Sequence, residues 1–231
     1  MEDDVQKLAA LRTPFPGESD AYRDARTDLL AQEIALQRQI DAVAEQRSKL
    51  PPGPAVEKDY RFRDMNGDEV GLADLFGGHD TLVTYFQMYG PERERPCPMC
   101  TNLLGPLDAN ALDITQRVAL VVLARSPVDR QLAFARERGW RHLRFLQTVG
   151  DAFALDFGGL DPKKGGENPV LTVFRKDGDK VRLFWKGAMT GEMAEEGKDP
   201  RGIPDVASVW TVLDLTPGGR GTDWYPKLDY R

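Results

Sequence analysis

The chain of 231 residues is poor in cysteine and histidine, with two of each. A zinc cage of four cysteines within one chain is therefore excluded, and so is a small fold held together by several disulfides. No apolar run approaches the roughly 18 residues that a membrane-spanning helix needs, so we expect a soluble protein without a membrane partner. The chain begins Met-Glu-Asp-Asp, with no basic segment leading into an apolar one. This start predicts that no secretory signal is present and that the protein is cytoplasmic.

An excess of positive charge is also missing. The chain carries 31 Lys and Arg against 37 Asp and Glu, which gives a net charge of −6. Such a balance disfavours binding to a phosphate backbone, and we expect no nucleic-acid partner. The composition, with 41% hydrophobic and 29% charged residues, is ordinary for a globular protein. The chain is long enough to bury a core.

A long stretch without glycine or proline runs from residue 21 to residue 49. Aliphatic residues recur there and just beyond it at sevenfold spacing, at Leu29, Leu36, Val43 and Leu50. This pattern predicts a long amphipathic helix, which the run Pro51-Pro52-Gly53-Pro54 ends. Two interpretations stay open. The helix packs on its own domain, or it is an arm that pairs with a second copy of the chain.

Beyond the prolines, strand-like and helix-like segments alternate, as in an α/β protein. The predicted segments are a hairpin of 60–63 and 69–71, a helical turn at 72–76, strands at 81–88, 118–124 and 143–146, a second hairpin of 170–174 and 181–185, and a helix at 205–213. Helices are expected after the strands at 81–88 and 118–124. The helix after 118–124 would begin with Ser126 as its N-cap and Pro127 at its first position.

With the first hairpin set aside, this order is thioredoxin-like. We therefore predict an α/β fold in which a central mixed sheet is flanked by helices, with the long N-terminal helix appended. Residues 1–54 are predicted to form the N-terminal helical arm and its Pro-rich linker. Residues 55–231 are predicted to form the thioredoxin-like domain.

Both cysteines fall in one motif, Cys97-Pro98-Met99-Cys100, between a predicted strand and a predicted helix. At a helix N-terminus, unpaired N–H groups and partial positive charge favour thiolate over thiol, so Cys97 is the expected nucleophile. Three residues make about one helical turn, which places Cys100 beneath Cys97. From there Cys100 could attack a mixed disulfide formed on Cys97, so the pair could open and close.

Two further features bear on this motif. The dipeptide Asn168-Pro169 directly precedes a predicted strand, where thioredoxin-like folds place a cis-proline against the cysteines. An ordinary trans proline at a strand start is the alternative. Arg93 and Arg95 could add positive potential beside Cys97, although a solvated loop is the alternative because glutamates alternate with them.

Other uses of a Cys-x-x-Cys motif need partners that the sequence lacks. Intrachain zinc would require His79 and His142, neither of which has a zinc-ligand spacing, so we predict no metal and no bound cofactor. An iron-sulfur cluster would need thiolates from two subunits. The peroxiredoxin-type motif has threonine three residues before its cysteine, and Glu94 occupies that place relative to Cys97.

Several short motifs follow one another in a characteristic order. They are Leu50-Pro51-Pro52-Gly53, Asp59-Tyr60-Arg61-Phe62, 72–78, Gly90-Pro91, Cys97-Pro98-Met99-Cys100, Arg138-Gly139-Trp140 and 213–220. Over residues 22–220 the chain resembles the bacterial domain-of-unknown-function 899 family. Members of that family are regarded as thioredoxin-like and are often labelled predicted dithiol-disulfide isomerases. The resemblance therefore implies a thioredoxin-like fold with Cys97 and Cys100 as its redox pair, and Pro169 beside them.

These observations predict a thiol-disulfide oxidoreductase in which Cys97 attacks a substrate disulfide and Cys100 resolves the adduct. Its partners would be a disulfide-containing substrate and an external reductant, and a homodimer through the N-terminal helix is one of the two arrangements left open for that helix. The competing hypothesis is a non-catalytic binding or assembly module on the same scaffold. In that case the thiols would be buried and inert, and the long helix would be the contact surface.

Overall fold

The computed structural model describes residues 2–163, 165–188, 207–221 and 223–230. The chain divides into two compact units, Met1–Pro51 and Pro52–Arg231, called the N-terminal and C-terminal units below. In the described ranges, every helix is either too short or too polar to cross a membrane. The assignment of residues 1–54 to an arm with its linker and of residues 55–231 to a domain stays a prediction.

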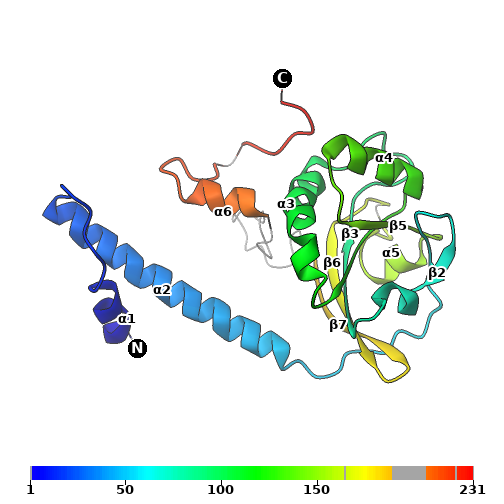
Figure 1. Ribbon diagram of the computed structural model, residues 1–231, viewed down its shortest axis with the longest axis horizontal. Helices are drawn as coiled ribbons and strands as arrows, with labels where there is room; N and C mark the ends of the chain where they lie inside the picture. The colour runs from blue at the N-terminus through cyan, green and yellow to red at the C-terminus, as the bar shows by residue number, and fades with distance from the viewer. Residues whose placement is uncertain (1, 164, 189–206, 222, 231) are drawn as a thin grey trace. The chain divides into compact units, whose positions relative to one another are not determined.

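The N-terminal unit is a helical hairpin of α1 (Glu2–Ala9) and α2 (Asp20–Ser48), drawn in blue in Figure 1. Helix α2 begins after Ser19, whose hydroxyl oxygen accepts a hydrogen bond from the Tyr22 N–H, and it ends just before the prolines. The sequence predicts α2 nearly to the residue. It does not predict α1, because eight residues are fewer than the window of roughly 11 to 18 residues over which helical periodicity is recognised.

Helix α2 carries two apolar stripes rather than one. The first stripe packs against Val5 and Ala9 of α1 and consists of Leu30, Ala31 and Ile34. The sevenfold stripe found in the sequence is a different one, and its large side chains are exposed. The contact with α1 therefore leaves the sevenfold stripe available, and a homodimer through it stays a prediction.

The C-terminal unit is built on a seven-stranded sheet in the order β2-β1-β5-β4-β3-β6-β7. Its strands are β1 (Arg61–Arg63), β2 (Glu69–Gly71), β3 (Thr81–Phe86), β4 (Ala119–Ala124), β5 (Arg144–Thr148), β6 (Val170–Asp177) and β7 (Lys180–Ala188). Its helices are η1 (Leu72–Phe76), α3 (Pro98–Ile114), α4 (Val128–Arg138), α5 (Ala152–Asp156) and α6 (Ser208–Asp214). Every predicted hairpin, strand and helix has a counterpart, although residues 205 and 206 of the last predicted helix lie outside the described residues.

The pairing of the central strands defines the fold. Strand β3 lies parallel to β4 on one side and antiparallel to β6 on the other, and α3 connects β3 to β4. The four strands β4-β3-β6-β7, with a helix directly after β3, form the thioredoxin-like arrangement. The predicted fold is confirmed, including the mixed sheet and the long appended N-terminal helix.

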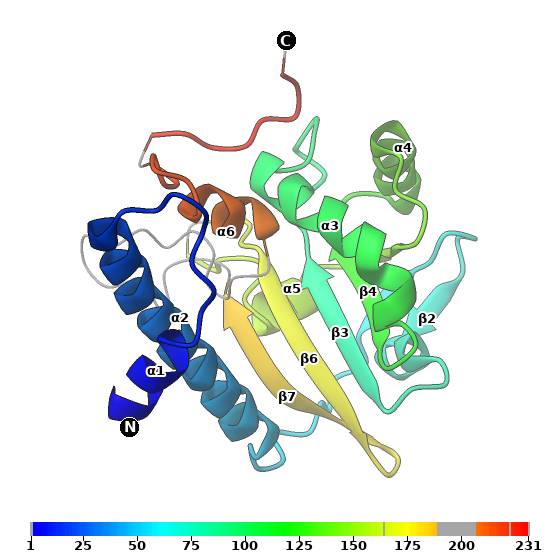
Figure 2. The same cartoon turned by 60° about the vertical axis from the view of Figure 1, so that its left-hand side comes forward.

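Helix α3 covers one face of the sheet, and α5 lies on the other face (Figure 2). Successive side chains of each strand point to opposite faces, so the core forms two layers. The layer between the sheet and the elements η1 and α5, called the aromatic layer, consists of Tyr60, Phe62, Leu72, Leu75, Phe76, Leu82, Phe86, Ala119, Val121, Leu123, Leu146, Phe153, Ala154, Leu160, Val170 and Phe174. The layer between the sheet and the helices α3 and α4, called the thiol layer, consists of Tyr85, Cys100, Leu103, Leu104, Val122, Ala135 and Phe145.

One predicted helix cap is wrong by a residue. Helix α4 begins at Val128, its N-cap is Pro127, and no side chain caps it. Ser126 is fully buried one residue earlier, and its N–H donates to the Tyr89 carbonyl at 2.8 Å. The buried Ser126 hydroxyl has no hydrogen-bond partner among the described residues, so it does not cap the helix.

Candidate active site

The two cysteines occupy the first turn of α3, next to the segment that leaves β3. Cys97 is the N-cap of α3, and Pro98 fills the first helical position. The Cys97 N–H donates to the Met88 carbonyl at 3.1 Å, which ties the cysteine to the end of the central strand. The Cys97 side chain is partly exposed, whereas Cys100 is completely buried. Substrate can therefore approach only the first sulfur directly.

The surroundings of Cys97 favour its thiolate. A hydrogen bond from the Cys100 thiol, together with the N–H groups of Cys100 and Met99 and the charge of Arg93, lowers the pKa of Cys97 to about 6, although burial opposes the shift. A free cysteine titrates near roughly 8.5. Cys97 is therefore mostly thiolate at neutral pH, which is the nucleophilic form.

The surroundings of Cys100 have the opposite effect. Burial and the hydrogen bond to Cys97 raise the pKa of the Cys100 thiol well above its ordinary value. Two donors act against this rise, the Tyr85 hydroxyl and the Met88 N–H. Cys100 is thus held as a thiol while Cys97 is a thiolate, and the two sulfurs are prepared for different steps.

Arg93 and Arg95 behave differently from one another. The positive charge of Arg93 contributes to the lowered pKa of Cys97, and its Nε also donates to Glu167 Oε2 at 3.2 Å. Arg95 instead forms an ion pair with Glu137 of α4. Of the two arginines considered from the sequence, Arg93 is therefore the one that acts on Cys97.

Glu167 is a site residue that the sequence does not reveal. Its side chain is only 6% exposed, its Oε2 accepts the Gly90 N–H at 2.9 Å, and its Oε1 lies 3.6 Å from Arg125 Nη1. A Cβ at position 90 would lie 2.6 Å from Glu167 Oε1, so the glycine allows this close approach. Through these contacts, Glu167 joins the loop before Cys97 to the segment before β6. Because Glu167 and its partners are far apart in the sequence, no local pattern predicts their contact.

Pro169 stands directly before β6, at the same edge of the sheet as the loop that leads to Cys97. The first residue of β6, Val170, is paired with Phe86, the last residue of β3. Pro169 therefore lies opposite Gln87, the first residue of that loop. The adjacent Asn168 N–H donates to the Gly159 carbonyl at 2.9 Å. A direct role for Pro169 beside the thiols stays a prediction.

Neither histidine is part of a metal-ligating group. Within the described residues, no three His, Cys, Asp or Glu side chains are placed together to hold a metal ion. His79 follows η1, and its N–H donates to the Phe76 carbonyl at 3.0 Å. His142 is exposed, and its N–H donates to Asp108 Oδ1 at 2.8 Å.

Nearly the whole chain matches a known protein family. Residues 12–230 match the family described as "Bacterial protein of unknown function (DUF899)". The chain belongs to this family. The resemblance seen in the sequence motifs is thus confirmed over nearly the whole chain. A search of curated proteins found no match.

Solved structures of thiol proteins are among those similar to this DUF899 chain. PrxQ from Xylella fastidiosa is 14% identical, with 72% of this chain and 96% of that chain covered and a TM-score of 0.45. Peroxidoxin BcpB from Mycobacterium tuberculosis is 18% identical, with 69% and 95% covered and a TM-score of 0.45. The exposed lipoprotein thioredoxin Etrx1 from Streptococcus pneumoniae is 14% identical, with 68% and 100% covered and a TM-score of 0.41.

Proposed function

We propose that this DUF899 protein is a dithiol-disulfide oxidoreductase that uses Cys97 and Cys100. The observation that carries the proposal is the unequal state of the two sulfurs at one helix start. Cys97 is partly exposed with its pKa lowered to about 6, and Cys100 is buried as a thiol that donates to it. An attacking thiol is most effective when its pKa lies near the ambient pH, so Cys97 suits the first step.

The proposed reaction exchanges disulfides without a bound cofactor. The Cys97 thiolate attacks one sulfur of a substrate disulfide, forms a mixed disulfide and releases the first substrate thiolate, which takes up a proton. Cys100 then loses its proton and attacks the Cys97 sulfur. A Cys97–Cys100 disulfide forms, and the second substrate thiol leaves with a proton. An external dithiol restores the starting thiols and is itself oxidised to a disulfide.

The competing hypothesis of a binding module with inert thiols agrees with the surroundings of Cys100 but not with those of Cys97. A completely buried thiol with a raised pKa, such as Cys100, is expected to be unreactive. Cys97 has neither property, because it is partly exposed and its pKa is lowered. The oxidoreductase proposal therefore accounts for both cysteines, whereas the inert module accounts for one.

The test uses the full chain with dithiothreitol as reductant and the disulfides of insulin as substrate. We expect the unmodified protein to accelerate insulin reduction and Cys97→Ser to abolish the acceleration. Cys100→Ser should instead accumulate a covalent adduct, because the nucleophile remains and the resolving thiol is gone. If the unmodified protein is as inactive as Cys97→Ser on insulin and on glutathione disulfide, the proposed function is wrong.

A further inference from the structure

The burial of Cys100 makes the second half of the proposed reaction difficult. Cys100 must become a thiolate before it attacks the Cys97 sulfur, yet its side chain is 0% exposed and lies within the thiol layer. A charged sulfur without water is strongly disfavoured unless fixed donors replace the water. The reaction therefore needs a donor inside the protein, directed at this sulfur.

Tyr85 is placed to be that donor. Its side chain is 1% exposed, and its hydroxyl donates a hydrogen bond to the Cys100 sulfur. Tyr85 and Cys100 pack together with apolar side chains of the thiol layer, among them Leu104 and Val122. A hydroxyl in such surroundings can act on the forming thiolate without competition from bulk water.

The position of Tyr85 is fixed by the sheet. Strand β3 is central, and Tyr85 is paired with Val122 of β4 on one side and with Leu171 of β6 on the other. The Met88 N–H, three residues further along the chain, donates to the same sulfur. Two donors from one backbone segment thus converge on Cys100, and neither has to move for the reaction.

Resting on the proposed oxidoreductase function, we propose that Tyr85 is a catalytic residue of the resolving step, whose hydroxyl stabilises the Cys100 thiolate as it attacks the mixed disulfide on Cys97. Tyr85 is not the base, because burial raises its pKa and keeps its own proton in place. The proton of Cys100 ends on the departing substrate thiol. One disulfide replaces another, so the step consumes no oxidant or reductant.

The test separates the two steps with one probe, the aromatic disulfide dithiobis(nitrobenzoate), mixed rapidly with the reduced full-length protein. Attack by Cys97 releases one coloured thiol in a first phase, and attack by Cys100 releases another in a second phase. Tyr85→Phe keeps the ring and removes only the hydroxyl. We expect an unchanged first phase and a second phase slowed about 10- to 100-fold, the range that a hydrogen bond to a charged atom supplies.

The matched control is Tyr60→Phe. Tyr60 is also a buried tyrosine whose hydroxyl donates a hydrogen bond, but its acceptor is Asp156 and its ring packs in the aromatic layer. We expect both phases of Tyr60→Phe to be unchanged. A second phase that is unaffected by Tyr85→Phe, or slowed equally by Tyr60→Phe, overturns the role of Tyr85.

A second variant guards against misfolding of Tyr85→Phe. A fluorinated tyrosine at position 85 keeps the ring and has a more acidic hydroxyl, so it should speed the second phase. A second phase that is no faster overturns the proposal as well. Failure of the proposed function gives a different result, because the unmodified protein would then lack the first or the second phase itself.

Discussion

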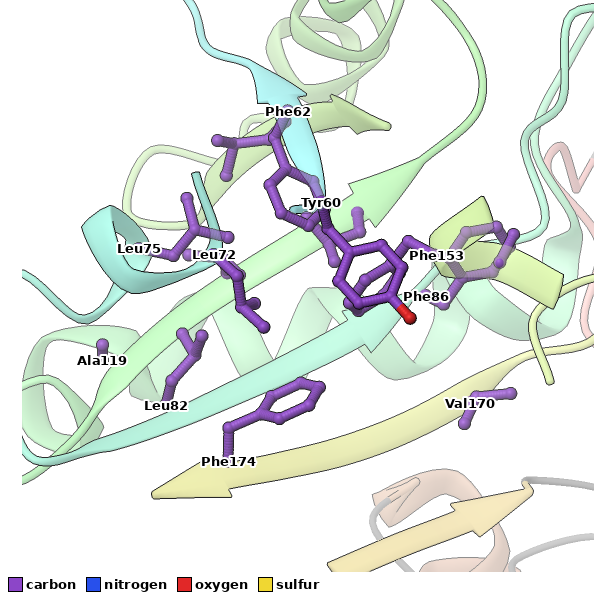
Figure 3. Packing of buried hydrophobic residues seen from close by; sticks show 14 of the residues in the cluster. Tyr60, Phe62, Leu72, Leu75, Leu82, Phe86, Ala119, Phe153, Val170 and Phe174 are labelled. Carbon is purple, nitrogen blue, oxygen red and sulfur yellow. The ribbon is translucent and has the colours of Figure 1, made fainter. Parts of the chain in front are cut away.

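The two faces of the sheet use their buried side chains in different ways. In the aromatic layer, Phe153 makes edge contacts with Tyr60 at 5.4 Å and with Phe62 at 5.2 Å between ring centroids. The hydroxyl of Tyr60, whose ring is labelled in Figure 3, donates to the exposed Asp156 carboxylate. The thiol layer instead places a tyrosine hydroxyl beside a thiol in its interior. One face is thus dominated by contacts between rings, and the other also holds groups that take part in the proposed reaction.

Adjacent residues on the same strand separate these tasks. Tyr85 and Phe86 are neighbours on β3, yet the first belongs to the thiol layer and the second to the aromatic layer. The sheet therefore separates the side chains of the thiol layer from those of the aromatic layer. We therefore expect that a large loss of stability in the aromatic layer leaves thiol reactivity in the thiol layer unchanged.

The largest expected effect comes from Phe153→Ala in the aromatic layer. This change removes a ring that is 3% exposed, and we expect it to lower the free energy of unfolding by about 3 to 5 kcal/mol, measured by urea denaturation. The pH midpoint of Cys97 alkylation in the folded variant should be unchanged. A shifted midpoint would show that the two layers are coupled.

A smaller effect is expected from Asp108→Asn on α3. The buried Asp108 carboxylate accepts N–H groups of Arg141, His142 and Leu143 at 2.8 to 3.1 Å, and it fixes the loop before β5. Weakening these charge-assisted bonds should cost about 2 kcal/mol of unfolding free energy. We expect both phases of the two-phase thiol assay to keep their rates. Altered rates would extend the chemical role of this face beyond Tyr85 and the cysteines.

The titration of Cys97 should itself contribute to stability. The folded-state pKa of about 6 lies below the unfolded value of roughly 8.5. The contribution is therefore fully present above pH 8.5 and is lost as the pH falls through 6. The full shift corresponds to about 3 kcal/mol. Because solvent screens the partly exposed sulfur, we expect the unfolding free energy of the unmodified protein to rise between these limits by about 1 to 2 kcal/mol relative to Cys97→Ser. A difference that stays constant over this interval would contradict the lowered pKa.

The smallest effect is expected from Tyr60→Phe. Its hydroxyl donates to an exposed carboxylate, so its loss should cost about 1 kcal/mol of unfolding free energy or less by urea denaturation. Tyr85→Phe also removes only a hydroxyl, but that hydroxyl donates to the Cys100 sulfur rather than to a carboxylate at the surface. If Tyr60→Phe proved the more damaging variant for thiol chemistry, the division of tasks between the layers would be wrong.

Much of the fold could be predicted from local patterns. The unbroken apolar run of β4 predicts a strand covered on both faces, and Asn66-Gly67 predicts the tight turn between β1 and β2. The Cys-x-x-Cys motif predicts two thiols on one helical turn. Each of these features depends on residues that are close in the sequence.

Features that depend on distant residues could not be predicted in this way. Glu167 meets Gly90 across the sheet edge, and Tyr85 meets Cys100 across the thiol layer. Tyr85 looks like any aromatic residue of a buried strand, and its role becomes visible only when the facing helix is in place. The predicted Ser126 cap is wrong as well, because the helix begins one residue later than expected. Ser126 is instead buried, and its N–H binds the distant Tyr89 carbonyl.

The most direct test of the account is the pH dependence of alkylation of the reduced native protein by iodoacetamide, with each cysteine followed separately by peptide mass spectrometry. The account predicts that Cys97 is labelled with a midpoint near pH 6, while Cys100 stays unlabelled as long as the protein is folded. A Cys97 midpoint near the ordinary value of roughly 8.5, or equal labelling of both thiols, would contradict it.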